Sequence, residues 1–284
     1  MDPSARHLVP WKRGPFMVLN VGGLLAMIAW LAAAVAVIAR GPDGFRGSTP
    51  FLACAGLALI PLVIWRGRGM QRAQGGIVRN EDALAMLRVG RYGEAATVLN
   101  ELCHDARHAP ALHALYVFNL GMASLYLGAI DTARALIERA RASGWLGLQA
   151  FAHQGPHIAL GHALCLALAG ELDAARRALE EARAGLGEAR RAATMLVQAV
   201  IDAREGREVG FDAEALRQAE SCHMPAHIRA LRLLEAFTRA RGQGAYREDP
   251  RDGANGIHPG ELDFLGARWP EMHAFLEQHG LLAA

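Results

Sequence analysis

Two long runs of apolar residues near the start of the chain stand out from an otherwise mixed pattern. They extend from Phe16 to Ala39 and from Pro50 to Trp65, and neither contains a charged residue. The first run is longer than the roughly 20 helical residues that cross a hydrocarbon core. It is also too long for the core of a cleaved signal peptide, which has about 7–15 apolar residues. The pattern therefore predicts a two-helix transmembrane hairpin over residues 16–66.

Positive charges on both sides of this hairpin predict its orientation. They are concentrated in an N-terminal segment, residues 1–15, and in a basic juxtamembrane linker, residues 67–79, whereas the turn between the runs has only Arg40 and Arg46. Flanking cations are retained on the cytoplasmic side of a membrane. We therefore expect both termini in the cytoplasm, the loop 41–49 outside, and the chain in a bacterial inner membrane.

Small residues form a stripe along the first apolar run. They recur at a spacing that places them on one helix face, at Gly22, Ala26, Ala29, Ala33 and Ala36. Such a stripe lets two helix backbones approach closely. We expect it to pack against the second run, and homodimerisation through the first transmembrane helix is the alternative.

After residue 80 the pattern changes to helix–turn–helix units with a recurring turn. A glycine is followed two positions later by a large apolar residue and five positions later by alanine, at Gly90, Gly128 and Gly170. Glycine ends a helix readily in the left-handed conformation. Alanine lets two antiparallel helices approach closely, and the apolar residues that follow at helical spacing form one buried stripe. In the middle unit, Leu120-Gly121 supplies a second close contact between the helices.

This pattern resembles the tetratricopeptide repeat (TPR) family, whose units of about 34 residues pair two helices. The resemblance is good over residues 80–184 and poor over 187–241. The repeats are longer than the family's, Val117 and Ala159 replace its leading aromatic residue, and Phe211 stands where the fourth unit should have alanine. The resemblance predicts an all-α fold, in which the transmembrane helical hairpin is followed by a TPR-like α-solenoid over residues 80–241.

Further helices are predicted toward the end of the chain. The charge-free stretch Ile158–Ala169 is too short to cross a membrane and is expected to be a core helix of the solenoid. Pro225–Arg241 has the pattern of an amphipathic helix. Residues 242–284 form a turn-rich segment with short helices over 261–265 and 270–279, which we expect to cap the open end of the stack.

The resemblance also implies a binding surface. Repeat stacks of this kind bind peptides on the concave face lined by the first helix of each unit. We expect Arg88, Tyr116 and Asn119 near that face, as residues that bind a protein partner. Asn119 stands at a position that contacts peptide backbone in many members of the family, and an ordinary exposed polar residue is the alternative.

The distribution of charge narrows the class of partner. The net charge of +2 combines a basic first part, which suits the anionic headgroups of a lipid bilayer, with a mildly acidic remainder. An acidic domain disfavours a nucleic-acid partner. The four cysteines are scattered without a CxxC pair, as expected of buried thiols in a reducing compartment.

Histidines are the only candidates for chemistry. His104, His108 and His113 have the same spacing as a second trio, His153, His157 and His162. Two histidines four residues apart on one helix can bind a metal. Pro110 and Gly155-Pro156 interrupt the trios, however, so each straddles the start of a helix. We therefore predict structural or surface roles for them, and no catalytic, cofactor-binding or metal site.

These observations lead to a functional hypothesis. The chain is expected to be a membrane-anchored, non-enzymatic adaptor or scaffold that recruits a protein partner to the inner membrane. The alternative is an envelope-biogenesis factor with periplasmic repeats, similar in architecture to assembly factors of cytochrome c maturation.

Overall fold

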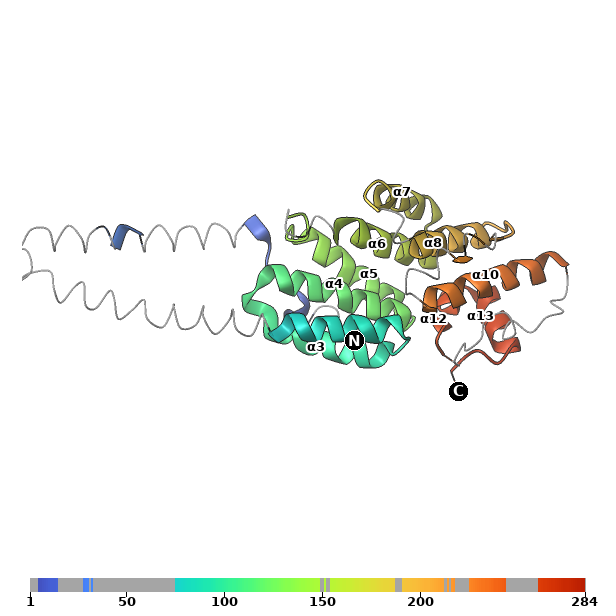
Figure 1. The fold of residues 1–284 in the computed structure, drawn as a ribbon, viewed down its shortest axis with the longest axis horizontal. Helices are drawn as coiled ribbons and strands as arrows, with labels where there is room; N and C mark the ends of the chain where they lie inside the picture. Colours follow the sequence, from blue (N-terminus) through green and yellow to red (C-terminus); the bar gives the residue numbers. More distant parts are fainter. Residues whose placement is uncertain are drawn as a thin grey trace, which may run out of the picture.

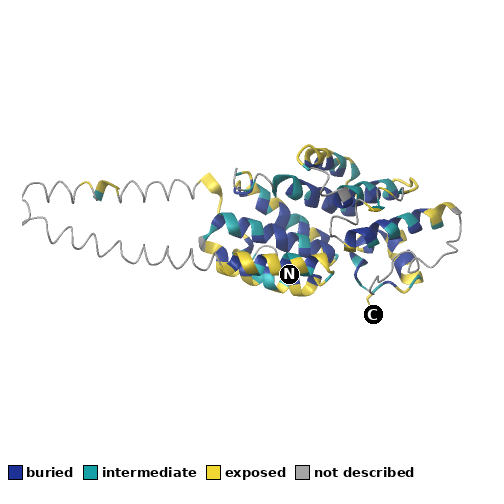
Figure 2. Cartoon of the chain, in the orientation of Figure 1, coloured by how far each residue is buried: buried dark blue, intermediate teal, exposed yellow. Residues whose placement is uncertain are grey.

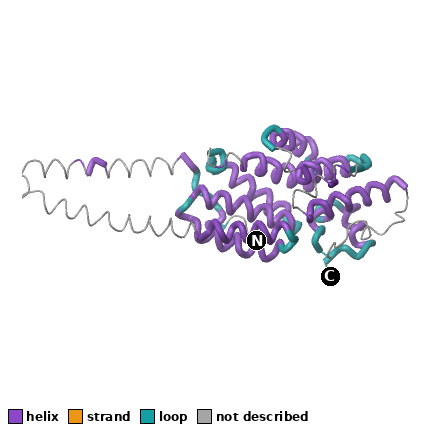
Figure 3. The backbone as a smooth tube through the Cα atoms, in the orientation of Figure 1, coloured by secondary structure: helices purple, strands orange, loops and turns teal. Residues whose placement is uncertain are grey.

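The computed structural model describes part of the chain. The described ranges are residues 5–14, 28–30, 32, 75–148, 151, 154–186, 191–211, 214, 216–217, 225–243 and 260–283. All regular structure in these ranges is helical, which confirms the all-α prediction for them (Figure 3). Within the same ranges, no helix combines the length and the apolar character needed to cross a membrane. The hairpin predicted over 16–66 lies almost entirely outside the described residues, as do residues 67–74 of the linker.

Stacked antiparallel helices form the main body of the molecule (Figure 1). In chain order these are helical residues 75–88, α3 (Tyr92–Asp105), α4 (Pro110–Tyr126), α5 (Ile130–Ala142), α6 (Gly155–Ala169), α7 (Leu172–Arg183), α8 (Arg191–Arg204) and α10 (Pro225–Gln243). A short 3-10 helix, η2 (Ala106–His108), joins α3 to α4. Helix α4 packs on α5 and α6 on α7, and successive pairs contact one another through α3–α4, α5–α6 and α7–α8. This arrangement agrees with the predicted solenoid of helix pairs.

The turn glycines have the backbone conformation that the sequence predicts. The φ angle is 88° at Gly90, 76° at Gly128 and 86° at Gly170, and it is 82° at Gly206 after the less regular α8. Residues with a Cβ enter this left-handed region only at a cost in free energy. Each of these glycines therefore ends the first helix of a pair and reverses the chain, as expected.

Close approach of the paired helices is also confirmed. Ala95, Ala133 and Ala175, the alanines of the repeated turn, have no exposed surface. A Cβ added to Gly121 of α4 would lie 2.9 Å from Cγ1 of Ile137 and 3.3 Å from the carbonyl oxygen of Ala133, both in α5. The small residues thus set the distance between α4 and α5.

The core lies between the two layers of helices, and the outer surfaces of α3, α5 and α7 are exposed (Figure 2). Helix α6 is buried along most of its length, from Ile158 to Leu168. The predictions of a charge-free core helix over 158–169 and of a helix starting at Pro225 are therefore confirmed.

Residues 5–14 pack on this domain, which the sequence did not predict. They include the 3-10 helix η1 (Arg6–Leu8), and Leu8 is fully buried in the same hydrophobic core as the stack. Nε2 of His7 is 3.0 Å from Oδ1 of Asn100 in α3, and Nε2 of His113 in α4 is 2.7 Å from the carbonyl oxygen of His7. Residues 1–15 were expected to form a segment separate from the helix stack. Residues 5–14 of that segment are instead part of the folded domain.

The same segment continues along the end of α5. The indole Nε1 of Trp145 donates to the carbonyl oxygen of Trp11 at 2.7 Å, and the amide of Arg13 donates to the carbonyl oxygen of Ser143 at 2.9 Å. Residues 5–14 therefore bridge α3, α4 and the residues after α5. We call these residues the N-terminal clasp.

The basic linker predicted over 67–79 ends earlier than expected. Residues 75–79 are already helical and belong to the first helix of the stack. Gly76 allows this packing, because a Cβ there would lie 2.9 Å from the hydroxyl oxygen of Tyr116.

The C-terminal helices α12 (Asp263–Gly266) and α13 (Pro270–Gln278) differ in their positions. Helix α13 packs on α10, the last helix of the stack, with the rings of Phe275 and Phe237 5.4 Å apart. Helix α12 instead lies on the edge formed by the turns, where Ala267 approaches Gly128, and Arg268 pairs with Asp131. The prediction that both helices cap the open end is therefore wrong for α12. The turn at Gly128 has no side chain and leaves room for the segment.

Candidate functional site

A cleft of about 300 Å³ opens on the face formed by the first helices of successive pairs. Its wall is built from residues 75–88, α4, α6 and α8, with the starts of α3 and α10 at one end. The residues that line it are Glu81, Leu84, Leu87, Arg88, Tyr92, Phe118, Asn119, Met122, Tyr126, Gln154, His157, Leu160, Gly161, Leu164, Ala193, Val197, Ala226 and His227. Six helical segments, from residue 81 to residue 227, thus contribute to one site.

The floor of the cleft is apolar and the charges lie at one rim. Leu84 and Leu87 on the first helix and Leu160 and Leu164 on α6 all line the cleft. Glu81 and Arg88 are exposed and lie on the same helix as Leu84, at positions that share one helix face. The site therefore offers an apolar surface to a ligand and a charged edge along one side.

Aromatic residues close one end of the cleft. The rings of Tyr92 and Tyr126 are stacked with centroids 5.0 Å apart, and the hydroxyl of Tyr126 is hydrogen-bonded to Nε2 of His227 at 2.7 Å. Burial raises the pKa of both tyrosines well above the ordinary value, and the nearby carboxylate of Glu261 adds to the shift at Tyr92. Both phenols are therefore neutral hydrogen-bonding groups at physiological pH.

The three residues predicted to bind a partner have different environments. Arg88 and Asn119 line the cleft. Asn119 is almost fully buried, however, and its amide nitrogen donates to Oδ1 of Asn80 at 2.8 Å, so its side chain joins α4 to the first helix. Tyr116 is not part of the cleft lining, and its ring is 1% exposed in the core. The prediction that Tyr116 lies near the partner-binding face is therefore wrong. The prediction that Arg88 and Asn119 bind a partner stays a prediction.

The sequence reasoning missed most of the cleft. Phe118 and Met122 of α4 are four positions apart and both line the cleft. Apolar residues at this spacing share one helix face, so a search for such pairs on the face of α4 that points away from α5 could have found both residues. His227 had no such signal, because it joins Tyr126 from a position 101 residues later in the chain.

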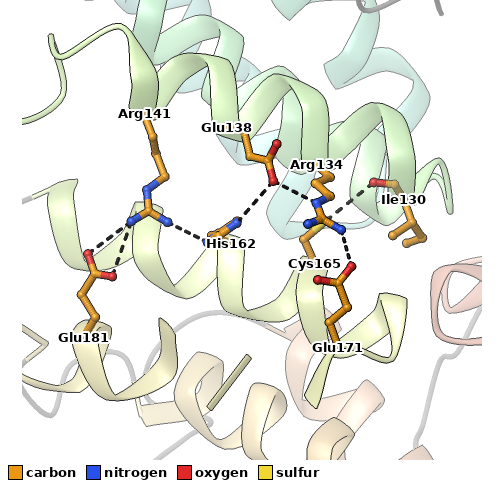
Figure 4. A network of polar contacts seen from close by, with 8 residues as sticks. All are labelled: Ile130, Arg134, Glu138, Arg141, His162, Cys165, Glu171 and Glu181. Carbon is orange, nitrogen blue, oxygen red and sulfur yellow. Dashed lines mark hydrogen bonds and ion pairs between the residues drawn. The ribbon is translucent and has the colours of Figure 1, made fainter. Parts of the chain in front are cut away.

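Of the described histidines of the two trios, His113 is buried, His157 and His162 are partly buried, and His104 is exposed. His162 in α6 lies in a polar network that joins α5, α6 and α7 (Figure 4). Nη1 of Arg141 donates to Nδ1 of His162 at 2.6 Å, so the proton of the neutral ring is on Nε2, which faces Glu138 at 3.9 Å. Burial, followed by the charge of Arg141, lowers the pKa of His162.

The remaining members of this network are ion pairs between neighbouring helices. Arg134 of α5 pairs with Glu138 on the same helix and with Glu171 before α7, and Arg141 lies 3.4 Å from Glu181 of α7 (Figure 4). These contacts link adjacent helix pairs at the surface. They place His162 in the packing of the stack rather than in the cleft.

Among the described residues, no group of three or more His, Cys, Asp or Glu side chains is arranged to hold a metal ion. His153 and the Cys222-His223 pair lie outside those residues. Cys103 and Cys165 are buried, and burial raises the pKa of both thiols above the ordinary value, to about 12 at Cys165. A thiol that stays protonated is a poor nucleophile.

Comparison of the chain with family models, with curated proteins and with solved structures found no match.

Proposed function

We propose that this chain is a membrane-anchored helical-repeat adaptor, which holds a segment of a protein partner in the cleft and thereby recruits the partner to a bacterial inner membrane. The observation that carries the proposal is the apolar cleft on the face formed by the first helices. In TPR-like stacks, which the repeat pattern resembles, that face binds peptides.

The N-terminal clasp supports the anchoring part of the proposal. The clasp ends at Gly14 and the stack begins by residue 75, and the two predicted spans lie between these positions. Because the clasp packs on α3, α4 and the end of α5, both flanks of the hairpin belong to one folded body. A hairpin of two spans returns the chain to the side from which it entered and is compatible with this contact, whereas a single span is not.

The shape and chemistry of the cleft support the binding part. Peptide recognition by helical stacks depends on apolar side chains that enter a groove and on polar groups at its rim. Leu84, Met122 and Leu160 supply an apolar surface, and Glu81 and Arg88 supply a charged rim. The cleft residues come from several helix pairs, so the site exists only when the stack is assembled.

The proposal is tested by recovery of the partner with cleft variants of the full chain, from detergent-solubilised membranes. Leu84→Glu places a charge in the apolar floor and should abolish recovery of the protein that wild type retains. Ala85→Glu is the matched control, because Ala85 is the next residue, is exposed, and does not line the cleft. It should leave recovery unchanged.

Helical content and thermal unfolding of each variant separate binding from folding. If Leu84→Glu unfolds the domain, Arg88→Glu at the exposed rim serves as the second cleft variant. Retention of the partner by both cleft variants would show that the adaptor does not use this cleft.

A further inference from the structure

The charged rim of the cleft has a definite order along one helix. Glu81 and Arg88 are seven positions apart, which separates them by two turns, or roughly 10.5 Å, along the helix axis. Leu84 and Leu87 lie between them, and all four residues line the cleft. The rim therefore presents an acid, an apolar surface and a base, in that order.

Neither rim charge is neutralised within the part of the chain that the structure describes. Glu81 and Arg88 are exposed there and form no ion pair with a described residue. Neighbouring arginines behave differently, since Arg79 pairs with Glu101 and Asp105, and Arg91 pairs with Glu94. The two rim charges are thus available to a ligand.

The rest of the cleft lining has no comparable charges. Apart from Glu81 and Arg88, the lining residues include no Asp, Glu, Lys or Arg, and α6 contains none along its whole length. Any charge selectivity must therefore come from the first helix. A ligand in the cleft meets opposite charges at the two ends of one rim and apolar surface beneath them.

We propose that the occupant of the cleft is an amphipathic helical segment of a partner protein, with one acidic and one basic residue about two turns apart that flank an apolar face. Its acid lies opposite Arg88, its base lies opposite Glu81, and its apolar side chains contact Leu84 and the floor. For a segment that lies in a given direction, only one order of charges fits the rim, because the reversed order places like charges together. This inference rests on the proposed function and adds the chemistry of the partner to it.

The test uses a displayed library of short helical peptides against the full chain in detergent. All peptides share one apolar face and carry Lys, Glu or Gln at two positions seven residues apart. Wild type should enrich peptides with one acid and one base in a single order, by about threefold to tenfold over peptides with two Gln residues, as expected of two exposed ion pairs. Raising the salt concentration should reduce this preference.

A charge-swapped variant makes the test specific. In Glu81→Lys with Arg88→Glu the order of the rim charges is reversed, so the order of charges in the enriched peptides should reverse as well. The matched control combines Asp82→Lys with Arg177→Glu, which makes the same charge changes at two exposed positions outside the cleft. The control should select the same peptides as wild type.

The possible outcomes separate this inference from the proposed function. Enrichment without any preference for charge order, or the same order with wild type and the swapped variant, would overturn the inference and leave an apolar peptide cleft. If wild type retains no peptide of any charge above background, both the inference and the peptide-binding function are wrong.

Discussion

Tyr116 and Asn119 lie three residues apart on α4, and the fold gives them different roles. The Tyr116 ring is in the core, where burial raises the pKa of its hydroxyl to about 12. Asn119 lines the cleft while its amide binds Asn80. A polar or amphipathic residue on a helix that lines the cleft thus does not necessarily line the cleft itself, because each position faces a different neighbour.

The burial of Tyr116 leads to a stability prediction. Tyr116→Ala should lower the free energy of unfolding by about 3–5 kcal/mol, the usual cost of removing a buried aromatic ring. Tyr116→Phe should cost less than about 1 kcal/mol, because the hydroxyl has no hydrogen-bond partner among the described residues. Denaturant unfolding followed by circular dichroism measures both. A neutral Tyr116→Ala would place the ring at the surface, as the sequence suggested.

His113 should make the stability of the domain depend on pH. Its ring is buried, and its pKa lies below the ordinary 6.5, first because of burial and then because of the charge of Arg107, although the hydrogen bond to His7 opposes the shift. The unfolded chain therefore binds the proton more tightly than the folded one. The free energy of unfolding should fall as the pH is lowered through about 6.5.

The measurement is denaturant unfolding of wild type and of His113→Gln between about pH 8 and about pH 5, a range that spans the ordinary titration of histidine. Wild type should lose more stability over this range than the variant does. Equal losses would mean that His113 does not contribute to the pH dependence.

At the scale of the elements, small residues decide how the helices pair. Ala133 is fully buried where α5 meets Gly121 of α4, so Ala133→Phe should lower the free energy of unfolding by about 1–3 kcal/mol through overpacking. Ala85→Phe, at an exposed position of the first helix, should cost less than about 1 kcal/mol from helix propensity alone. Equal effects at the two positions would contradict close packing of α4 on α5.

The N-terminal clasp is an element that places an apolar side chain in the core of the stack. Leu8 is fully buried, and Leu8→Asp should therefore lower the free energy of unfolding by several kcal/mol or release the clasp from α3 and α4. Proteolysis before and after the substitution distinguishes these results, because release frees the backbone at Arg6 and Arg13, whose side chains are already exposed, for cleavage by trypsin. Unchanged stability together with unchanged protection would contradict the contact.

At the scale of the whole molecule, the clasp constrains the topology. A reporter placed before Met1 and one placed after Ala284 should report the same side of the membrane, because residues 5–14 contact the stack. The flanking cations predict that this side is the cytoplasm, so an alkaline phosphatase fusion should be inactive and a fluorescent protein fusion should fluoresce. An active phosphatase at both ends would place the domain in the periplasm, and opposite results at the two ends would contradict the hairpin.

The sequence by itself determined the local structure of the helix stack. The glycines at 90, 128 and 170 and the alanines five positions later specified the turns and the close helix contacts, because left-handed backbone and small volume are properties of single residues. The start of α10 at Pro225 and the core helix over 158–169 followed from apolar spacing within one element. Local rules suffice for such features.

Only the tertiary structure decided which distant residues meet. It brought Leu8 into the core, placed α12 along the turn edge, buried Tyr116 away from the cleft, and joined His227 to Tyr126 across 101 positions. No repeat period or motif in the sequence predicts these contacts. They depend on how every helix between the two contacting residues is rotated and spaced relative to the next. The turns and helices of this protein are therefore specified residue by residue, whereas its cleft and its clasp arise from the assembled stack.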